Sequence, residues 1–113
     1  MNGGWKDLKL EEVCLQIIAL SGDAKSKAYK AFAEAEKGAY ANAKQLLKEA
    51  DDNIGQAHKI QFELISNEAR EGKIAPTILL IHAMDILMTA MSEKELIRRM
   101  VNCLKKCNNS SHS

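Results

Sequence analysis

Residues 74–91 read IAPTILLIHAMDILMTAM, and this stretch decides how the rest of the chain can fold. From residue 78 to residue 91 every position is apolar except His82, Asp85 and Thr89. A helix that is apolar on all sides must be covered on all sides, because it offers no face suited to water. The polar residues are three and four positions apart, so they share one stripe of that helix. Because an unpaired charge is costly to bury, the stripe indicates either a core histidine satisfied by a carboxylate or a functional site.

The composition favours a single helical domain over residues 1–113. One proline and six glycines leave long uninterrupted runs, which are typical of helices. With 16 basic and 15 acidic residues the net charge is +1, so the chain lacks the basic footprint expected for binding nucleic acid or an anionic membrane. The N-terminal residues lack the apolar segment of a secretory signal, and residues 78–91 are too few to span a bilayer. We expect a soluble cytoplasmic protein.

The three cysteines are Cys14, Cys103 and Cys107, an odd number without a C-x-x-C motif. Cys103 and Cys107 are four residues apart, a spacing that two ligands of a metal site can have. No neighbouring histidine or further cysteine completes a set of four ligands. We therefore predict reduced thiols without a functional role.

Apolar periodicity predicts three helices, at about residues 8–36, 39–71 and 76–106, followed by a polar tail at 107–113. Asp7 is the expected N-cap of the first helix. This helix carries small and apolar residues at intervals of three or four positions, namely Val13, Ile17, Leu20, Ala24, Ala28, Ala31 and Ala35. At its middle, the Ser21-Gly22 pair predicts a kink or a close helix contact, since glycine is a poor helix former.

The second predicted helix has the most regular apolar seam, formed by Ala43, Leu47, Ala50, Ile54, Ala57, Gln61 and Leu64. His58 lies three residues before Gln61, and the pattern favours two boundary residues bonded to each other or to water. Gly38 and Gly72 are expected to end the first and second helices. Pro76 is expected to open the third helix, because proline is tolerated only in a first turn.

Three long helices joined by short turns predict an all-α fold, an antiparallel up-down-up three-helix bundle. Such a bundle needs one inward stripe on each helix, whereas residues 78–91 are apolar nearly all round. Self-association through the third helix is the simplest cover for this surplus apolar surface. A ring of odd order around that helix would bring several copies of one side chain together on an axis.

The segment His82-Ala83-Met84-Asp85-Ile86-Leu87-Met88-Thr89 resembles a motif of a known family, the enzyme IIA component of the lactose/cellobiose type in the bacterial phosphoenolpyruvate-dependent sugar phosphotransferase system. The family pattern is His-Ala-Gln-Asp-His-Leu-Met-Thr. The resemblance extends over nearly the whole chain, through Ile17-Ile18, Gly22-Asp23-Ala24, and Ala57-His58 with Gln61. It implies a cytoplasmic phosphocarrier that forms an all-α homotrimer.

The resemblance also implies roles for individual residues. His82 would accept a phosphoryl group from the phosphohistidine carrier protein and pass it to a cysteine of the cognate IIB component, with the membrane component IIC acting downstream. Its Nε2 atom is the usual phosphoryl acceptor in the family. Asp85 would lie at the trimer axis, where three carboxylates share one divalent cation, usually magnesium. The resemblance implies a sugar of the β-glucoside, lactose or cellobiose type, and it does not specify which one.

Two residues of the motif depart from the family pattern, because Met84 replaces glutamine and Ile86 replaces the second histidine. Both changes remove hydrogen-bonding groups next to the expected phosphoryl acceptor. An alternative hypothesis is therefore a divergent, non-catalytic or regulatory three-helix interaction module. A third hypothesis, a metalloprotein that uses His82 and Asp85 as ligands, also needs an oligomer, because two ligands cannot fill a coordination shell.

Overall fold

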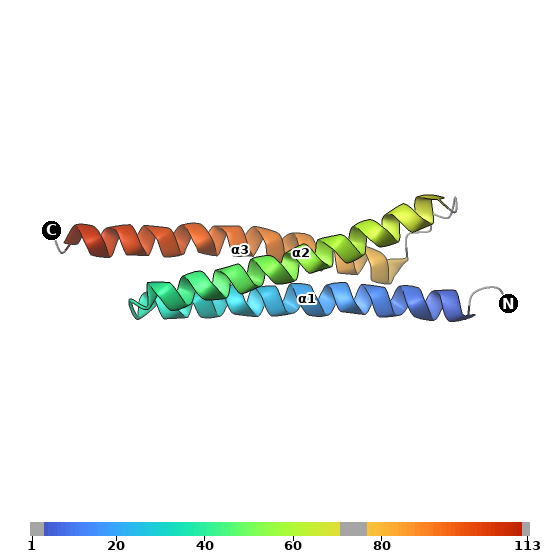
Figure 1. Cartoon of the computed structure of the whole chain (residues 1–113), viewed down its shortest axis with the longest axis horizontal. Helices are drawn as coiled ribbons and strands as arrows, with labels where there is room; N and C mark the ends of the chain where they lie inside the picture. The colour runs from blue at the N-terminus through green and yellow to red at the C-terminus, as the bar shows by residue number, and fades with distance from the viewer. Residues whose placement is uncertain (1–3, 71–76, 112–113) are drawn as a thin grey trace.

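The computed structural model describes residues 4–70 and 77–111, which form three α-helices and, within these ranges, no strand (Figure 1). They are α1 (Gly4–Glu36), α2 (Tyr40–Arg70) and α3 (Ile78–Ser111). In Figure 1, α2 returns along α1, and α3 runs in the same direction as α1. The result is a rod of 69 × 18 × 18 Å. The predicted all-α class with three long helices is confirmed.

The helix α1 is central, because it packs against both other helices along one face. The buried residues of this face recur at steps of three or four positions, and they are Cys14, Ile17, Ser21, Ala24, Ala28, Ala31 and Ala35. The predicted alanine strip is therefore confirmed, and its small side chains allow close approach of the neighbouring helices. Toward the N-terminus the buried positions are Cys14 and Ser21, whereas Val13 and Leu20 are only partly buried. Counting backward from Ala24 in steps of three and four residues leads to Ser21, Ile17 and Cys14. The predicted positions Leu20 and Val13 are each one residue off this series.

The core of the bundle consists of two clusters along the rod. The proximal cluster, which is the one nearer the N-terminus of α1, contains Cys14, Ile17, Ala24, Ala50, Ile54, Ala57, Ala83 and Leu87. The distal cluster contains Ala28, Ala31, Ala35, Ala43, Leu47, Ile97 and Val101. The predicted α2 seam is confirmed from Ala43 to Ala57, while Gln61 and Leu64 are only partly buried. No helix of the described residues is long and apolar enough to cross a membrane.

The connection from α1 to α2 is built around Gly38, as predicted. Gly38 has a φ of +82°, in the left-handed region that favours glycine. Its amide donates to the Ala35 carbonyl at 2.9 Å, and the Ala39 amide donates to the Glu34 carbonyl at 2.9 Å. These two bonds form a Schellman motif, which satisfies carbonyl groups at the end of α1.

Several predicted helix limits were wrong. Asp7 is not an N-cap, because α1 already begins at Gly4. The predicted tail is helical through Ser111, since Leu104 packs against the distal cluster and the Asn108 amide donates to the Tyr40 hydroxyl. Gly72 and Pro76 lie outside the described residues.

Within the Ser21-Gly22 pair, Gly22 itself makes no close helix contact. No neighbouring atom lies within 4 Å of the position where a Gly22 side chain would begin, and Gly22 is exposed. The buried residue of the pair is Ser21, whose hydroxyl has no hydrogen-bond partner among the described residues. The helix α1 continues through the pair without a break (Figure 1).

Candidate functional site

The two predicted site residues, His82 and Asp85, lie on α3 with exposed side chains. Their spacing of three residues places them one turn apart on the same side of the helix. The core side of this segment is formed by Ala83 and Leu87, which are 0% and 1% exposed. The interpretation of His82 as a core histidine satisfied by a carboxylate is therefore wrong for the chain as a single copy.

Neither functional group is held by the surrounding protein. Across residues 4–70 and 77–111, the His82 imidazole and the Asp85 carboxylate have no hydrogen-bond or ion-pair partner. The third polar residue of the stripe, Thr89, donates its hydroxyl to the main-chain oxygen of Asp85 at 2.8 Å. Thr89 is thus satisfied within its own helix, while His82 can meet a group that arrives from outside.

The surface around these residues is apolar. Large hydrophobic side chains are exposed along the same side of α3, and we define the exposed α3 face as Ile78, Ile81, His82, Asp85, Met88, Leu96 and Met100. Ile78 is 88% exposed and Met88 is 63% exposed. The opposite side of α3 is buried through Ala83, Leu87, Ala90, Ile97 and Val101. The surplus apolar surface expected from the sequence is therefore present on the single chain, and it surrounds Asp85.

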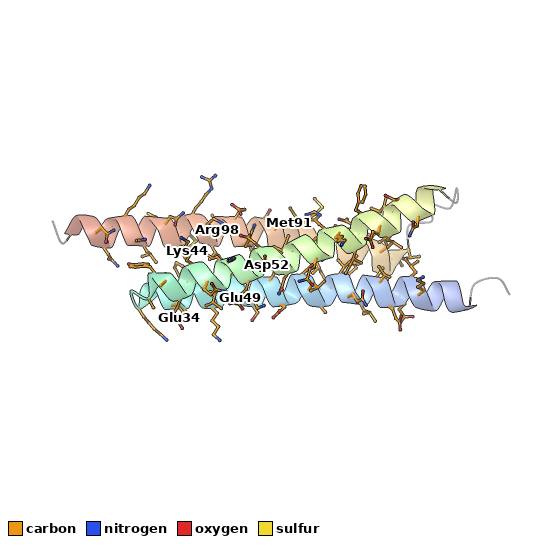
Figure 2. The ribbon with its side chains drawn as sticks, viewed as in Figure 1. Glu34, Lys44, Glu49, Asp52, Met91 and Arg98 are labelled. Atoms are coloured by element: carbon orange, nitrogen blue, oxygen red, sulfur yellow. The ribbon has the colours of Figure 1, made fainter. Side chains whose placement is uncertain are left out.

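His58 does not join this site. It is exposed on α2, and its Nε2 atom lies 2.9 Å from the Sδ atom of Met91, which Figure 2 labels on α3. The prediction of a bond to Gln61 or water did not anticipate this contact between helices. Among the described residues, no hydrogen bond links His58 to His82.

A polar cluster farther along the rod fixes α3 against α2. Asp51 accepts hydrogen bonds from Lys94 Nζ at 2.7 Å and from Arg98 Nη2 at 2.5 Å. Burial alone would raise the pKa of the Asp51 carboxyl, but these two hydrogen bonds hold it below its ordinary value. Figure 2 labels Arg98 on α3. We call Asp51, Lys94 and Arg98 the α2–α3 clamp.

A second set of polar contacts ties α1 to its neighbours. Asn53 donates to Asp23 Oδ2 at 2.6 Å, and Lys27 Nζ lies 3.2 Å from the same oxygen. These contacts lower the pKa of the Asp23 carboxyl. Lys25 Nζ forms an ion pair with Glu93 Oε2 on α3 at 3.3 Å. Of these contacts, the Lys25–Glu93 ion pair is the one that reaches α3, the helix that carries His82.

The sequence analysis missed the α2–α3 clamp. Its partners are 43 and 47 residues apart, so no local motif reveals them. One feature of the sequence could have indicated the clamp. Asp51 directly follows the seam residue Ala50, and charged residues at the edge of a seam commonly pair across helices.

A single chain does not provide a complete metal site in its described portion. No group of three or more His, Cys, Asp or Glu side chains there is arranged to hold a metal ion. Asp85 offers one carboxylate without a competing partner. A cation at Asp85 would therefore need oxygen ligands from other copies or from water.

Comparisons with known proteins identify the family. The family described as PTS system, Lactose/Cellobiose specific IIA subunit, matches residues 12–105. The chain is 39% identical over 98 residues to the N,N'-diacetylchitobiose-specific EIIA component of Escherichia coli strain K12, covering 87% of this chain and 84% of that protein.

Solved structures agree with this match. The crystal structure of the PTS cellobiose-specific enzyme IIA from Bacillus anthracis is similar with a TM-score of 0.81 and 39% identity, covering 87% of this chain and 90% of that one. The IIA(chitobiose) chain solved with HPr, from the N,N'-diacetylchitobiose branch of the Escherichia coli system, has a TM-score of 0.80 and 37% identity, covering 88% and 96%. The chain therefore belongs to the lactose/cellobiose-specific IIA family and is a phosphotransferase-type component of a sugar phosphotransferase system.

Proposed function

We propose that this chain is a cytoplasmic phosphocarrier in which His82 accepts a phosphoryl group from the phosphohistidine carrier protein and passes it to a cysteine of the cognate IIB component. IIC takes part indirectly, in uptake of a sugar of the β-glucoside, lactose or cellobiose type. The observation that carries this proposal is the exposed His82 imidazole, which has no partner among the described residues and lies within the family match. The relative solved in complex with HPr supports the identity of the donor, because HPr is the phosphohistidine carrier protein.

The chemistry needs little beyond an accessible nitrogen and a positioned donor. The neutral His82 imidazole, through Nε2, attacks the phosphorus of the donor phosphohistidine, so one N–P bond forms as the other breaks. The IIB cysteine thiolate then displaces the His82 nitrogen from phosphorus, which returns the neutral imidazole. Because both steps are displacements at phosphorus, they require access to His82 from outside, and the His82 side chain is exposed on the single chain.

Asp85 creates an electrostatic problem for a phosphorylated His82. The phosphoryl group carries close to two negative charges. With about 6 Å between the groups and an effective dielectric constant of about 20, the repulsion is about 3 kcal/mol per unit charge. We therefore infer that Asp85 is neutralised or directed away from the phosphoryl group.

An assembly of copies would meet this requirement. The proposal is that the up-down-up bundle forms a homotrimer through the exposed α3 face, which places one Asp85 from each chain near a common axis. His82 lies about 60° around the helix from Asp85, at the edge of this contact, where it stays accessible to the donor. Three carboxylates fit a hard cation that prefers oxygen ligands, and Mg²⁺ is the expected ion. Bound there, it would supply two positive charges that offset most of the negative charge of the three carboxylates. The exposed apolar residues around Asp85 support the assembly, because they need a cover.

The test of the carrier function is a phosphorylation assay. The protein is incubated with phosphoenolpyruvate and the general phosphotransferase proteins, and an acid-labile phosphoryl group is measured by intact mass. We expect one phosphoryl group per chain for the wild type and for the matched control His58→Ala, and none for His82→Ala. Failure of the wild type to be labelled, while the Escherichia coli relative is labelled in parallel, would overturn the proposal.

The alternative is a helical interaction module without chemistry. Met84 and Ile86 favour it, because both are apolar and only partly buried beside Asp85. It predicts a folded, assembled wild-type protein that is never phosphorylated, and a His82→Gln variant that keeps the full biological effect.

A further inference from the structure

Side-chain contacts between α2 and α3 recur at steps of seven residues. Asp51 on α2 accepts a hydrogen bond from Arg98 on α3. Seven residues farther along α2, His58 Nε2 lies 2.9 Å from the Sδ atom of Met91, which precedes Arg98 by seven residues. Seven residues are about two turns of a helix, so the contacts follow one line on each of two antiparallel helices. They define the register in which α2 and α3 face each other.

One further step of seven residues on each helix pairs Ile65 with Met84. The structure leaves this third pair open. Ile65 is 41% exposed, and neither residue belongs to the proximal cluster or to the side chains packed against it. Phe62, three residues before Ile65 and on the same side of α2, is 73% exposed. Two large apolar side chains of α2 therefore point toward α3 without being covered by it.

The exposure of Ile65 results from the path of α2 and not from its angle around the helix. Leu47 precedes Ile65 by 18 residues, or about five complete turns, so both residues have the same angle around α2. Leu47 is only 3% exposed. Toward its C-terminal end, α2 diverges from both α1 and α3 (Figure 1). The same side of α2 is therefore buried near the start of the helix and open near its end.

The opposite side of the opening is also apolar. Leu80 precedes Arg98 by 18 residues, so it has the angle around α3 from which Arg98 reaches α2. Leu80 and Met84 are both only partly buried. Met84 replaces the glutamine of the family motif, and its flexible thioether suits contact with an aliphatic side chain such as Ile65. Both helices thus present apolar side chains in the register that the polar contacts define.

The C-terminal part of α2 is held by few buried side chains. Ala57 is the last buried residue before the end of the helix for which burial is described, and residues 58–67 are all exposed or partly buried. Ile60 is the residue of this stretch that packs against the proximal cluster. Segments with little buried apolar contact move at a low cost in free energy. We call residues 58–67 the α2 arm.

We propose that the α2 arm has a second, closed position, in which it swings onto α3 so that Ile65 packs against Met84 and Phe62 covers the edge of this contact. The structure shows the open position. Closure extends the register of the Asp51 and His58 contacts by one step, and burial of apolar surface drives it. The cover for these apolar side chains is the chain's own α3.

Closure leaves the candidate site accessible. His82 lies two residues before Met84, which places it about 160° away around α3, on the side that the arm does not reach. The proposal therefore requires neither the carrier function nor an assembly of copies. The phosphorylation assay and the state of assembly report on those separately.

The test places a thiol on each side of the proposed contact. Full-length protein with Ile65→Cys and Met84→Cys is made in a Cys103→Ser, Cys107→Ser background, in which Cys14 remains as a buried thiol. A disulfide needs its two Cα atoms within about 4.4–6.8 Å, so its formation reports closure. The folded protein, checked by circular dichroism, is oxidised with glutathione disulfide, quenched by alkylation and analysed by non-reducing gel and intact mass. We expect a disulfide within one chain.

The matched control moves one thiol around α2. Glu63 is exposed and lies about 160° from Ile65, so Glu63→Cys with Met84→Cys in the same background should form the disulfide at least about tenfold more slowly. Equal rates for the two pairs, or no disulfide within the chain, would overturn closure. A covalent dimer in place of the intrachain bond would also overturn it, because a second copy would then be what meets Ile65.

A labelling experiment tests closure without a cross-link. Met84→Cys in the same background is alkylated with iodoacetamide, alone and combined with Phe62→Ala and Ile65→Ala. Because the closed arm covers position 84, the two alanine substitutions should raise the labelling rate at least about threefold. The control Leu15→Ala removes a side chain of α1 that is 51% exposed and should leave the rate unchanged. A labelling rate that does not respond to truncation of Phe62 and Ile65 would contradict the closed position.

Discussion

Replacing Asp51 by asparagine should loosen the α2–α3 clamp and destabilise the bundle. The carboxylate accepts from Lys94 at 2.7 Å and from Arg98 at 2.5 Å. The Lys94 side chain is 12% exposed, so the substitution leaves a largely buried ammonium group without its partner on α2. Lys94 keeps one acceptor, because Glu95 Oε1 lies 2.7 Å away on α3.

The magnitude lies between two limits. Exposed ion pairs contribute about 0–1 kcal/mol, whereas breaking a buried pair costs about 3–5 kcal/mol. The Asp51 side chain is 42% exposed and Glu95 still compensates Lys94, so we expect a loss of about 1–2 kcal/mol in the free energy of unfolding. For a chain of this length that corresponds to a decrease in Tm of about 4–8 °C.

The assay is urea denaturation at one protein concentration, since an assembly of copies would make stability depend on concentration. The matched control is Asp52→Asn, because Asp52 is exposed and has no partner among the described residues; it should change the free energy by less than about 0.5 kcal/mol. The folded-state pKa of Asp51 is lowered, so its contribution is present at neutral pH and is lost as the pH falls below about 4. Equal midpoints for wild type and Asp51→Asn at pH 7, or a difference that persists unchanged at pH 2, would refute the role of the clamp.

Three further substitutions test the axis, the turn and the core. Asp85→Leu should abolish stoichiometric binding of Mg²⁺, measured by metal analysis after gel filtration; an unchanged metal content would contradict a shared cation at Asp85. Gly38→Ala should cost about 1–2 kcal/mol in urea denaturation, because its φ of +82° is unfavourable for a residue with Cβ, whereas Gly22→Ala in the exposed middle of α1 should be neutral or stabilising. Ala31→Leu should cost at least about 1–3 kcal/mol, since Ala31 is 0% exposed in the α1 seam, and a circular-dichroism melt equal to wild type would show that the helices can separate without penalty.

Much of the fold could be predicted from local patterns. The spacing of alanines from Ala24 to Ala35 defines the packed face of α1, and Gly38 defines its end, because both depend on residues close in sequence. The C-terminal limit of α3 could not be found in this way. It depends on Tyr40 and Asn108, which are 68 residues apart.

The identity of the site residues could be predicted, but their environment could not. The motif singled out His82 and Asp85, yet residues 78–91 are apolar on every side, so periodicity does not show which side meets the core. That side is set by contacts of Ala83 and Leu87 with the proximal cluster, which includes residues of both other helices. Only this packing shows that His82 faces outward.

The same packing bears on the two departures from the family motif. Met84 and Ile86 lie about 100° to either side of Asp85, so they occupy opposite boundaries between the buried side and the exposed α3 face. Both are partly buried, and apolar side chains suit such boundaries because they extend the core. Their presence is therefore accounted for by packing and does not by itself remove His82 from solvent. A phosphocarrier of the proposed kind needs an α3 helix that packs against the core on one side and exposes an imidazole on the other. Ala83 is buried and the neighbouring His82 is exposed, so both requirements are met within a single turn.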